Sequence, residues 1–230
     1  HVEYFMIRNI IYLHGFASSP NSNKAKHITN FFKNKEIKII VPDLNCGDFS
    51  NVTVSKMLEE IRRVISQIDD RFVIIGSSLG GYLAALDVQE AEKKPENMLL
   101  LAPGFNLYEL FKNWLGNFGI AEWEKNGVFS FMHYSYNREM PLSYEFYRDL
   151  KRHPPFPQIG MVRAHIIHGT EDNVVPLSVT QEFIKINPHT TAEFVNDSHE
   201  LPHSIELILQ RTEDLTKENP DNSLRETTHF

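Results

Sequence analysis

The chain has 230 residues, of which 41% are hydrophobic, and a formal net charge of −7. This length and apolar content suffice for the core of one domain with a small insertion. The acidic balance and the absence of a Lys/Arg run argue against nucleic acid or an anionic membrane surface as partners, and no apolar stretch is long enough for a membrane span.

The number of cysteines gives information on the cellular compartment. Cys46 is the single cysteine, so an internal disulfide is excluded. The sequence also opens without a signal-peptide pattern. Both features favour a reducing compartment, and we expect a cytoplasmic protein.

The first part of the chain alternates between apolar, β-branched runs and segments with apolar residues at helical spacing. The former predict strands and the latter predict helices, with Ser22 or Asn23 as the cap of the first helix. The predicted elements are a short edge strand within 1–6, a strand over 9–13, a helix over 24–35, a strand over 37–41, a loop over 43–53, a helix over 54–68, a strand over 72–75, a helix over 79–91 and a strand over 98–101.

The alternation is lost between Phe105 and Phe156, a stretch that holds both Trp residues, seven Phe and five Tyr. We expect an insertion of short helices and loops over the sheet, in which most aromatics pack a small subdomain and a few line a pocket. The remaining predictions are a strand over 164–167, a helix over 178–186, a strand over 191–195, a helix over 202–211 and a polar, frayed segment from Thr212. As domains, we expect a core of 1–104 and 159–212, a small helical lid over 105–158 and a tail over 213–230.

Residues 72–82, Phe-Val-Ile-Ile-Gly-Ser-Ser-Leu-Gly-Gly-Tyr, carry the most specific motif. A buried strand leads into a turn that fits G-x-S-x-G, and a helix follows. This context presents a nucleophilic serine at the apex of a tight turn, here Ser78. We predict that Gly76 and Gly80 are glycines because a Cβ would collide with the neighbouring strand or helix. The alternative is an ordinary helix cap by one of the two serines.

The order of elements indicates an α/β fold, with a mostly parallel sheet of six to seven strands and helices on both faces. Ligand sites in such sheets lie at the carboxyl ends of the strands. Motifs at residues 14–16, 76–80, 168–172 and 196–199 all follow predicted strands directly. We therefore expect these distant segments to meet at one edge of the sheet.

A serine nucleophile needs a base, and the base needs an orienting acid. With the chain order serine, acid, histidine, Asp172 is the candidate acid and His199 is the candidate base. Each follows a predicted strand, and the 27 residues between them leave room for one helix and one strand. We therefore expect both side chains at the ends of adjacent strands.

Neighbouring residues compete for these roles. Glu171 is the nearest rival of Asp172, but it would point away if Asp172 faces the site. His203 competes with His199, but Pro202 predicts the first position of a helix, which would place His203 in the first turn.

The histidine spacings argue against a metal centre. His199 and His203 are four residues apart, a spacing typical of metal ligands on a helix, but the predicted helix begins between them. His165 and His168 lie on a predicted strand. We therefore expect no metal site.

The loop after the strand at 9–13 is the expected source of one oxyanion donor. In a nucleophile turn of this kind, one N–H follows the nucleophile and the other comes from this loop. We predict the N–H groups of Leu79 and Phe16, with Gly15 allowing the turn, the Phe16 ring as a pocket wall and His14 as a support. The alternative is a plain strand-ending turn.

Several short motifs also carry a resemblance to a known family. They are Leu13-His14-Gly15-Phe16, Ser18-Ser19-Pro20, Ser22, Lys24-Ala25, Pro42-Asp43-Leu44 and the segment 76–82. On these motifs the sequence resembles the α/β-hydrolase superfamily and, more closely, the small bacterial YqiA/YcfP-type esterases, over most of 9–104 and 160–210. The resemblance implies the α/β-hydrolase fold and a Ser–Asp–His esterase without a cofactor, with Ser78, Asp172 and His199 in those roles. The long insertion makes it a better guide to reaction type than to substrate.

We therefore expect a serine hydrolase that cleaves small-molecule carboxylic esters through an acyl-enzyme. A thioester, an amide or an N-terminal peptide bond is the alternative target of the same residues. A non-catalytic ligand-binding module on the same scaffold is a further alternative, and the presence of all three triad candidates argues against it.

Overall fold

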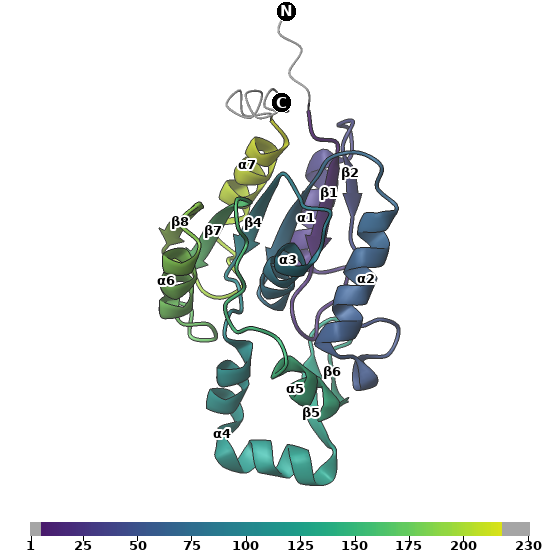
Figure 1. Cartoon of the computed structure of the whole chain (residues 1–230), viewed down its shortest axis with the longest axis vertical. Coiled ribbons are helices and arrows are strands. Elements are labelled where there is room, and N and C mark those ends of the chain that lie inside the picture. Colours follow the sequence, from purple (N-terminus) through teal and green to yellow (C-terminus); the bar gives the residue numbers. More distant parts are fainter. Residues whose placement is uncertain (1–5, 218–230) are drawn as a thin grey trace, which may run out of the picture.

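The computed structural model describes residues 6–217, and within them the strands form one six-stranded sheet and one two-stranded hairpin (Figure 1). All neighbours in the larger sheet are parallel, which confirms the predicted architecture. Its strands, in spatial order, are β2 (Lys38–Ile40), β1 (Asn9–Leu13), β3 (Phe72–Ser77), β4 (Asn97–Leu101), β7 (Arg163–Gly169) and β8 (Thr190–Val195). The edge strand expected within 1–6 lies outside the described residues except for Met6, which is in no strand.

The central strands are apolar on both faces because helices cover both. Along β3, Val73 and Ile75 belong to one hydrophobic cluster, and Phe72 and Ile74 belong to the other. Because side chains alternate along a strand, each face of the sheet has its own hydrophobic core. The first cluster lies under α1 (Asn23–Phe32) and α7 (Ile205–Thr216), and the second lies under α2 (Val54–Ser66), α3 (Leu79–Glu90) and α6 (Leu177–Ile186).

Helices α2 and α3 lie at different depths, and their sequences differ accordingly. Helix α2 has one buried stripe and begins after Thr53, whose hydroxyl accepts the Lys56 N–H at 3.2 Å. In α3, every residue from Leu79 to Val88 is buried. The helix that follows Ser78 is therefore surrounded by protein, and its position is fixed by packing on every side.

The insertion, residues 105–158, contains more regular structure than the predicted short helices and loops. Helix α4 (Leu107–Asn126) is bent at Gly116, whose φ of 66° and ψ of 171° are not helical, so its two halves run in different directions (Figure 1). An antiparallel hairpin of β5 (Val128–His133) and β6 (Arg138–Ser143) follows, and then α5 (Glu145–Leu150). The prediction of helices and loops alone was wrong on the hairpin.

The hairpin was missed because its alternation is masked. In β5, Phe129 and Phe131 are half-buried, but the exposed position Val128 is apolar as well, so the period of two does not stand out. In β6, Pro141 argues against a strand. It is tolerated because it is exposed on a two-stranded sheet, where both strands are edges.

The last helix begins later than the sequence predicts. It was expected from Pro202, but α7 starts at Ile205 and Pro202 lies in a turn before it. The buried carboxylate of Asp197 accepts the His203 N–H at 2.9 Å and the Ser204 hydroxyl at 2.8 Å. These bonds stabilise a turn at the position where the sequence predicts the first turn of the helix.

The same helix also ends later, so the prediction of fraying from Thr212 was wrong up to Thr216. Both threonines are buried, and their hydroxyls donate to the carbonyl oxygens of Ile208 and Glu213, each at 2.7 Å. Satisfied in this way, a polar side chain is compatible with a packed helix.

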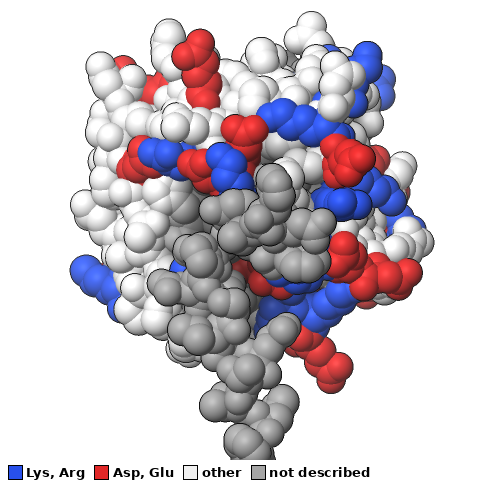
Figure 2. Space-filling view, turned by 90° about the horizontal axis from the view of Figure 1, so that it is seen from above, with Lys and Arg blue, Asp and Glu red and all other residues white. Residues whose placement is uncertain are grey.

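Charges of both signs are interspersed on one face of the molecule. Figure 2 views the molecule from above Figure 1, and on the part of that face not covered by grey atoms, acidic and basic side chains alternate. Among the described helices, none combines the length and apolarity needed to cross a membrane.

Candidate active site

The carboxyl ends of the parallel strands meet at the edge of the sheet nearest to α4 (Figure 1). Leu13 of β1 pairs with Gly76 of β3, and Gly169 of β7 pairs with Val195 of β8, so the loops that follow leave the sheet together. The expected convergence of distant segments is confirmed. Because β2 and β3 lie on opposite sides of β1, this edge also contains the switch point at which open α/β sheets bind ligands.

Ser78 lies at the turn between β3 and α3. Its φ of 53° and ψ of −115° are costly for a residue with a Cβ, so the surroundings must hold the turn. The Ser78 N–H donates to the Leu101 carbonyl oxygen at 2.9 Å, and the Ser78 carbonyl oxygen accepts the Gly104 N–H at 2.9 Å. Although Ser78 occupies the N-cap position, its hydroxyl makes no capping bond, which removes the helix-cap alternative.

Gly76 and Gly80 are glycines because the backbone approaches too closely for a side chain. A Cβ on Gly76 would lie 2.7 Å from the Cα of Gly81 in the helix. A Cβ on Gly80 would overlap the carbonyl oxygen of Leu13 in β1. Both predicted collisions, with the helix and with the neighbouring strand, are confirmed.

The Ser78 hydroxyl points to the ring of His199. Its Oγ lies 3.0 Å from His199 Nε2, and His199 Nδ1 lies 2.7 Å from Asp172 Oδ2. Because Nδ1 faces a carboxylate, it carries the ring proton, and Nε2 accepts from the hydroxyl. The side chain of Asp172 is fully buried and that of His199 is 13% exposed. Three loops thus bring hydroxyl, imidazole and carboxylate into one hydrogen-bonded chain.

Asp172 is held in its ionised form. Its Oδ1 accepts the N–H groups of Val174 and Val175 at 2.9 and 2.8 Å, and its Oδ2 lies 3.1 Å from His168 Nε2. Burial opposes ionisation, but the hydrogen bonds from His168 and His199 outweigh it and hold the pKa of Asp172 well below its usual range. Asp172 therefore remains a carboxylate at mildly acidic and neutral pH.

The two rival residues lie away from this chain of bonds. Glu171 is exposed, and its N–H donates to the Asp197 carbonyl oxygen at 3.0 Å. The His203 side chain is 84% exposed, and its Nδ1 lies 3.2 Å from Asp197 Oδ1.

The loop that carries His199 is anchored by the buried side chain of Lys24. Lys24 Nζ, on a side chain that is only 8% exposed, donates to the carbonyl oxygen and to Oε2 of Glu200, both at 2.8 Å. Gly169 allows the loop to approach β7, because a Cβ there would overlap the carbonyl oxygen of Asp197. Helix α1 and strand β7 therefore position a loop that is distant from α1 in sequence.

The loop at residues 14–16 lies against Ser78. A Cβ built on Gly15 would lie 3.5 Å from the Cβ of Ser78, which is ordinary contact. His14 supports the loop: its Nε2 accepts the Leu44 N–H at 3.0 Å, so its Nδ1 carries the proton and donates to the Gly15 carbonyl oxygen at 2.9 Å. Within the described part of the chain, the N–H groups of Phe16 and Leu79 have no hydrogen-bond partner.

The Phe16 ring is half-buried and packs against the insertion, and its role as a pocket wall stays a prediction. Its centroid lies 5.3 Å from that of Phe111, 5.4 Å from that of Phe131 and 5.7 Å from that of Phe146. The first two contacts are edge-to-face, the geometry that aromatic pairs favour. The ring therefore joins the aromatic core of the insertion and fastens that core to the loop beside Ser78.

Trp114 of α4 links the insertion to the loop of the acid. Its Nε1 donates to the Val174 carbonyl oxygen at 3.3 Å, two residues after Asp172. Its ring packs edge-on against Phe111 at 5.1 Å, and Phe111 in turn contacts Phe16. Trp114 as a whole is 42% exposed. Trp114 thus spans from the acid loop towards the loop at 14–16 and keeps part of its surface open.

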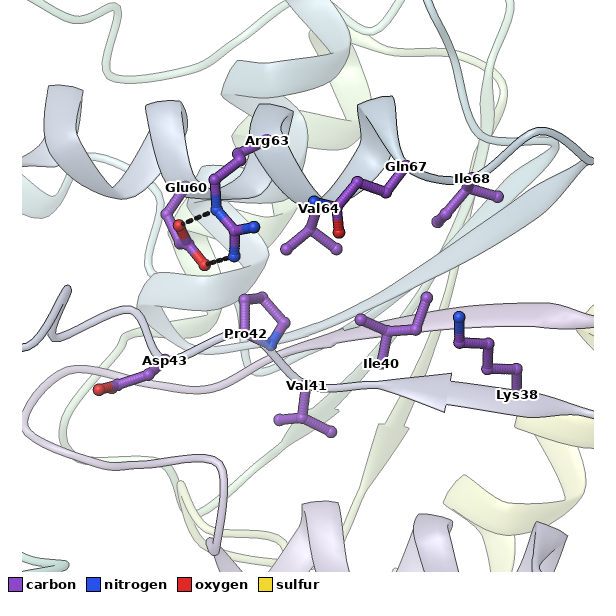
Figure 3. A pocket seen from close by; sticks show the side chains of 10 residues that line it. All are labelled: Lys38, Ile40, Val41, Pro42, Asp43, Glu60, Arg63, Val64, Gln67 and Ile68. Carbon is purple, nitrogen blue, oxygen red and sulfur yellow. Dashed lines mark hydrogen bonds and ion pairs between the residues drawn. The ribbon is translucent and has the colours of Figure 1, made fainter.

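Two surface pockets lie away from Ser78, His199 and Asp172. One, of about 340 Å³, lies between β2 and α2 and contains the Glu60–Arg63 pair (Figure 3). The other, of about 370 Å³, lies between Pro20 and Tyr136 at the tip of the hairpin. Neither is lined by a member of the hydrogen-bonded chain.

The described part of the chain offers no cluster of metal ligands. Between residues 6 and 217, no group of three His, Cys, Asp or Glu side chains could hold a metal ion. The ring of His165 bonds to Thr191 and Glu193, at 2.7 and 2.8 Å.

A family model described as Uncharacterised protein family (UPF0227) matches residues 9–215. The chain belongs to this family. The match spans the strands, the turn at Ser78 and the loops of Asp172 and His199. The solved structures described next confirm the fold that the resemblance to the α/β-hydrolase superfamily implies.

Solved structures of similar fold come from different organisms. Alpha/beta hydrolase domain-containing protein 10 from mouse shares 20% identity with a TM-score of 0.75, covering 90% of this chain and 88% of that chain. Est1E from Butyrivibrio proteoclasticus, with ferulic acid bound, shares 17% with a TM-score of 0.76, covering 92% and 89%. An Agrobacterium vitis S4 protein shares 21% with a TM-score of 0.77, covering 91% and 88%. At these identities the similarity shows the α/β-hydrolase fold.

Sequence reasoning missed two residues that contact the site. His168 was weighed only as a metal ligand, although its place at a strand end, four residues before Asp172, was a usable signal. Lys24 belongs to one of the short family motifs, but nothing in the sequence names its partner Glu200, 176 residues away.

Replacing Gly76 by Ala should lower the free energy of unfolding by about 2–4 kcal/mol, because the new Cβ must displace the start of α3. Urea denaturation measures the change. Gly15→Ala is the matched control, since its Cβ would make ordinary contacts at 3.5 Å. Equal stabilities of the two variants would contradict this account of the turn.

Replacing Lys24 by Met should loosen the His199 loop, because the Glu200 carbonyl oxygen loses a buried charged donor. We expect the amides of residues 198–201 to exchange with solvent about tenfold faster, measured by hydrogen–deuterium exchange and mass spectrometry. Lys26→Met, at an exposed position of the same helix, should leave the exchange unchanged. Full protection of the loop in Lys24→Met would show that this anchor is dispensable.

Proposed function

We propose that this chain is a serine hydrolase that cleaves carboxylic esters of small molecules through an acyl-enzyme intermediate. The observation that carries the proposal is the hydrogen-bonded chain from Ser78 through His199 to Asp172, with distances of 3.0 and 2.7 Å. The family and the fold support hydrolysis in general, and these three side chains supply the specific chemistry.

The first half of the reaction forms the acyl-enzyme. His199 Nε2 takes the hydroxyl proton as Ser78 Oγ attacks the ester carbonyl carbon, and the carbonyl oxygen becomes an oxyanion. The tetrahedral intermediate collapses, the bond to the alcohol oxygen breaks, and the imidazolium gives its proton to the departing alkoxide. The alcohol leaves, and the acyl group remains on Ser78.

The second half regenerates the enzyme. Water attacks the acyl carbon while His199 Nε2 accepts a water proton, and a second oxyanion forms. When this intermediate collapses, the bond to Ser78 Oγ breaks, His199 returns a proton to Oγ, and the carboxylic acid is released.

The N–H groups of Phe16 and Leu79 hold both oxyanions in this proposal. Their support is the absence of other partners within the described residues, the contact of the 14–16 loop with Ser78, and the position of Leu79 at the N-terminus of α3. A donor of this kind contributes roughly 3–4 kcal/mol to the transition state. Asp172, as a buried carboxylate, fixes the His199 tautomer and stabilises the imidazolium.

Ser78→Ala should lower kcat on p-nitrophenyl acetate by roughly four to six orders of magnitude, because it removes the nucleophile. The native protein should react with a fluorophosphonate at Ser78, located by mass spectrometry, and Ser78→Ala should not. Ser66→Ala, on the exposed end of α2, is the control and should behave as native. Unchanged turnover in Ser78→Ala would defeat the proposal, and a folded native protein that neither turns over esters nor reacts with the probe would favour a binding module. Parallel thioester and aminoacyl amide substrates report which acyl bond is preferred.

The insertion at 105–158 acts as a cap that shapes the substrate site in this proposal. Trp114 supports this role, because its indole N–H bonds to the acid loop while the residue stays 42% exposed. An exposed aromatic face favours contact with an aryl group. Est1E, which has the same fold, was solved with the aromatic ferulic acid, so aryl esters are the natural substrates to test first.

Trp114→Ala should lower kcat/KM for aryl esters about three- to tenfold more than for ethyl acetate, the range expected for one lost aromatic contact. Trp114→Phe, which keeps a ring but loses the N–H, should retain most of the aryl preference. A coupled assay for released acid compares the substrates. Equal losses on both ester classes would mean that Trp114 only anchors the insertion.

A further inference from the structure

His168 is a buried titratable side chain that the reaction above leaves unused. It lies next to the end of β7, directly before Gly169, and its side chain is fully buried. A buried histidine needs partners for both ring nitrogens, and here those partners include the acid of the site.

The contacts of the ring fix where its proton lies. His168 Nε2 lies 3.0 Å from the Val175 carbonyl oxygen and 3.1 Å from Asp172 Oδ2. Both oxygens accept, so Nε2 must carry a proton. His168 Nδ1 lies 2.8 Å from Thr180 Oγ1, whose hydroxyl can donate to it. The Nε2–H therefore points between the acid and the backbone of the acid loop.

Asp172 Oδ2 consequently receives two histidine donors. His199 Nδ1–H approaches it at 2.7 Å and His168 Nε2–H at 3.1 Å. The other oxygen, Oδ1, is occupied by the N–H groups of Val174 and Val175. With both oxygens engaged, the carboxylate has one orientation, and part of the charge that His199 would otherwise feel is shared with His168.

We propose that His168 is a positioning residue of the reaction: its Nε2–H fixes the Asp172 carboxylate and limits how strongly Asp172 stabilises protonated His199. The inference rests on the proposed roles of Ser78, His199 and Asp172. In the proposed reaction the base must also give its proton to the leaving alcohol, and a base that binds its proton too tightly does this slowly. A limit on the stabilisation of protonated His199 therefore favours turnover.

Other charged groups also lie near this arrangement. Besides His168 from β7, Glu200 from the His199 loop acts on Asp172 and His199, and it is paired with Lys24 of α1. A change at His168 that leaves Lys24 and Glu200 in place therefore reports on the second donor to Asp172.

His168→Leu should lower kcat about tenfold or more with KM nearly unchanged, because the carboxylate loses its fixed orientation. It should also move the acidic limb of the kcat/KM profile to higher pH. The reason for the direction is that Asp172, relieved of one donor, keeps more negative charge beside His199, and this charge favours the protonated ring. His168→Gln, whose amide can donate to Oδ2, should restore the limb towards its native position.

A readout that does not need turnover separates this inference from the proposed function. In Ser78→Ala, NMR titration of the His199 ring carbons should give a midpoint that rises on adding His168→Leu and returns with His168→Gln. Thr180→Val covers the case in which His168→Leu does not fold. It keeps His168 but removes the hydroxyl that donates to His168 Nδ1, and it should raise the midpoint by a smaller amount.

The outcomes are distinct. A midpoint that rises as expected in a protein without esterase activity would support the link from His168 to His199 while the proposed function fails. A midpoint that stays constant in folded His168→Leu or Thr180→Val, or equal defects in His168→Leu and His168→Gln, would show that His168 only fills space and would overturn the inference.

Discussion

The close approach of α3 to the ends of β1 and β3 is the constraint on which the rest of the structure depends. At Gly76 and Gly80 there is no room for a Cβ, and Ser78 between them adopts a positive φ that only dense surroundings can hold. On the side of β4, the backbone of Ser78 is hydrogen-bonded to Leu101 and Gly104, and these bonds also hold the turn. A turn held in this way keeps the Ser78 side chain in one position, as its proposed role as a nucleophile requires.

The parallel sheet brings the partners of Ser78 to one edge, and buried polar side chains hold their loops in position. The strand ends bring the loops together, but a loop with few apolar contacts needs other anchors. Lys24 holds the His199 loop through Glu200, His14 holds the loop of Phe16, and His168 holds Asp172. Buried polar groups of this kind are costly unless they are satisfied, so each partner is specified closely.

The insertion is joined to the site through aromatic packing. The Phe16 ring, beside Ser78, contacts Phe111, Phe131 and Phe146 from three different elements of the insertion. Trp114 adds a polar link to the acid loop. Any displacement of the insertion would therefore be felt by the loops on both sides of Ser78, because close-packed interiors transmit strain.

The sequence by itself determined the architecture and the position of the serine turn. Local signals suffice for these, because alternation, caps and glycines at a tight turn act over a few residues, as in the segment from Phe72 to Tyr82. The tertiary structure alone decided the contacts of Lys24 and His168, the hairpin of the insertion, and the helix that continues to Thr216. Each depends on partners or burial that local patterns do not encode: an ion-pair partner at the far end of the chain, a shared carboxylate oxygen, outward apolar residues that hide a strand, and threonine hydroxyls satisfied within a packed helix.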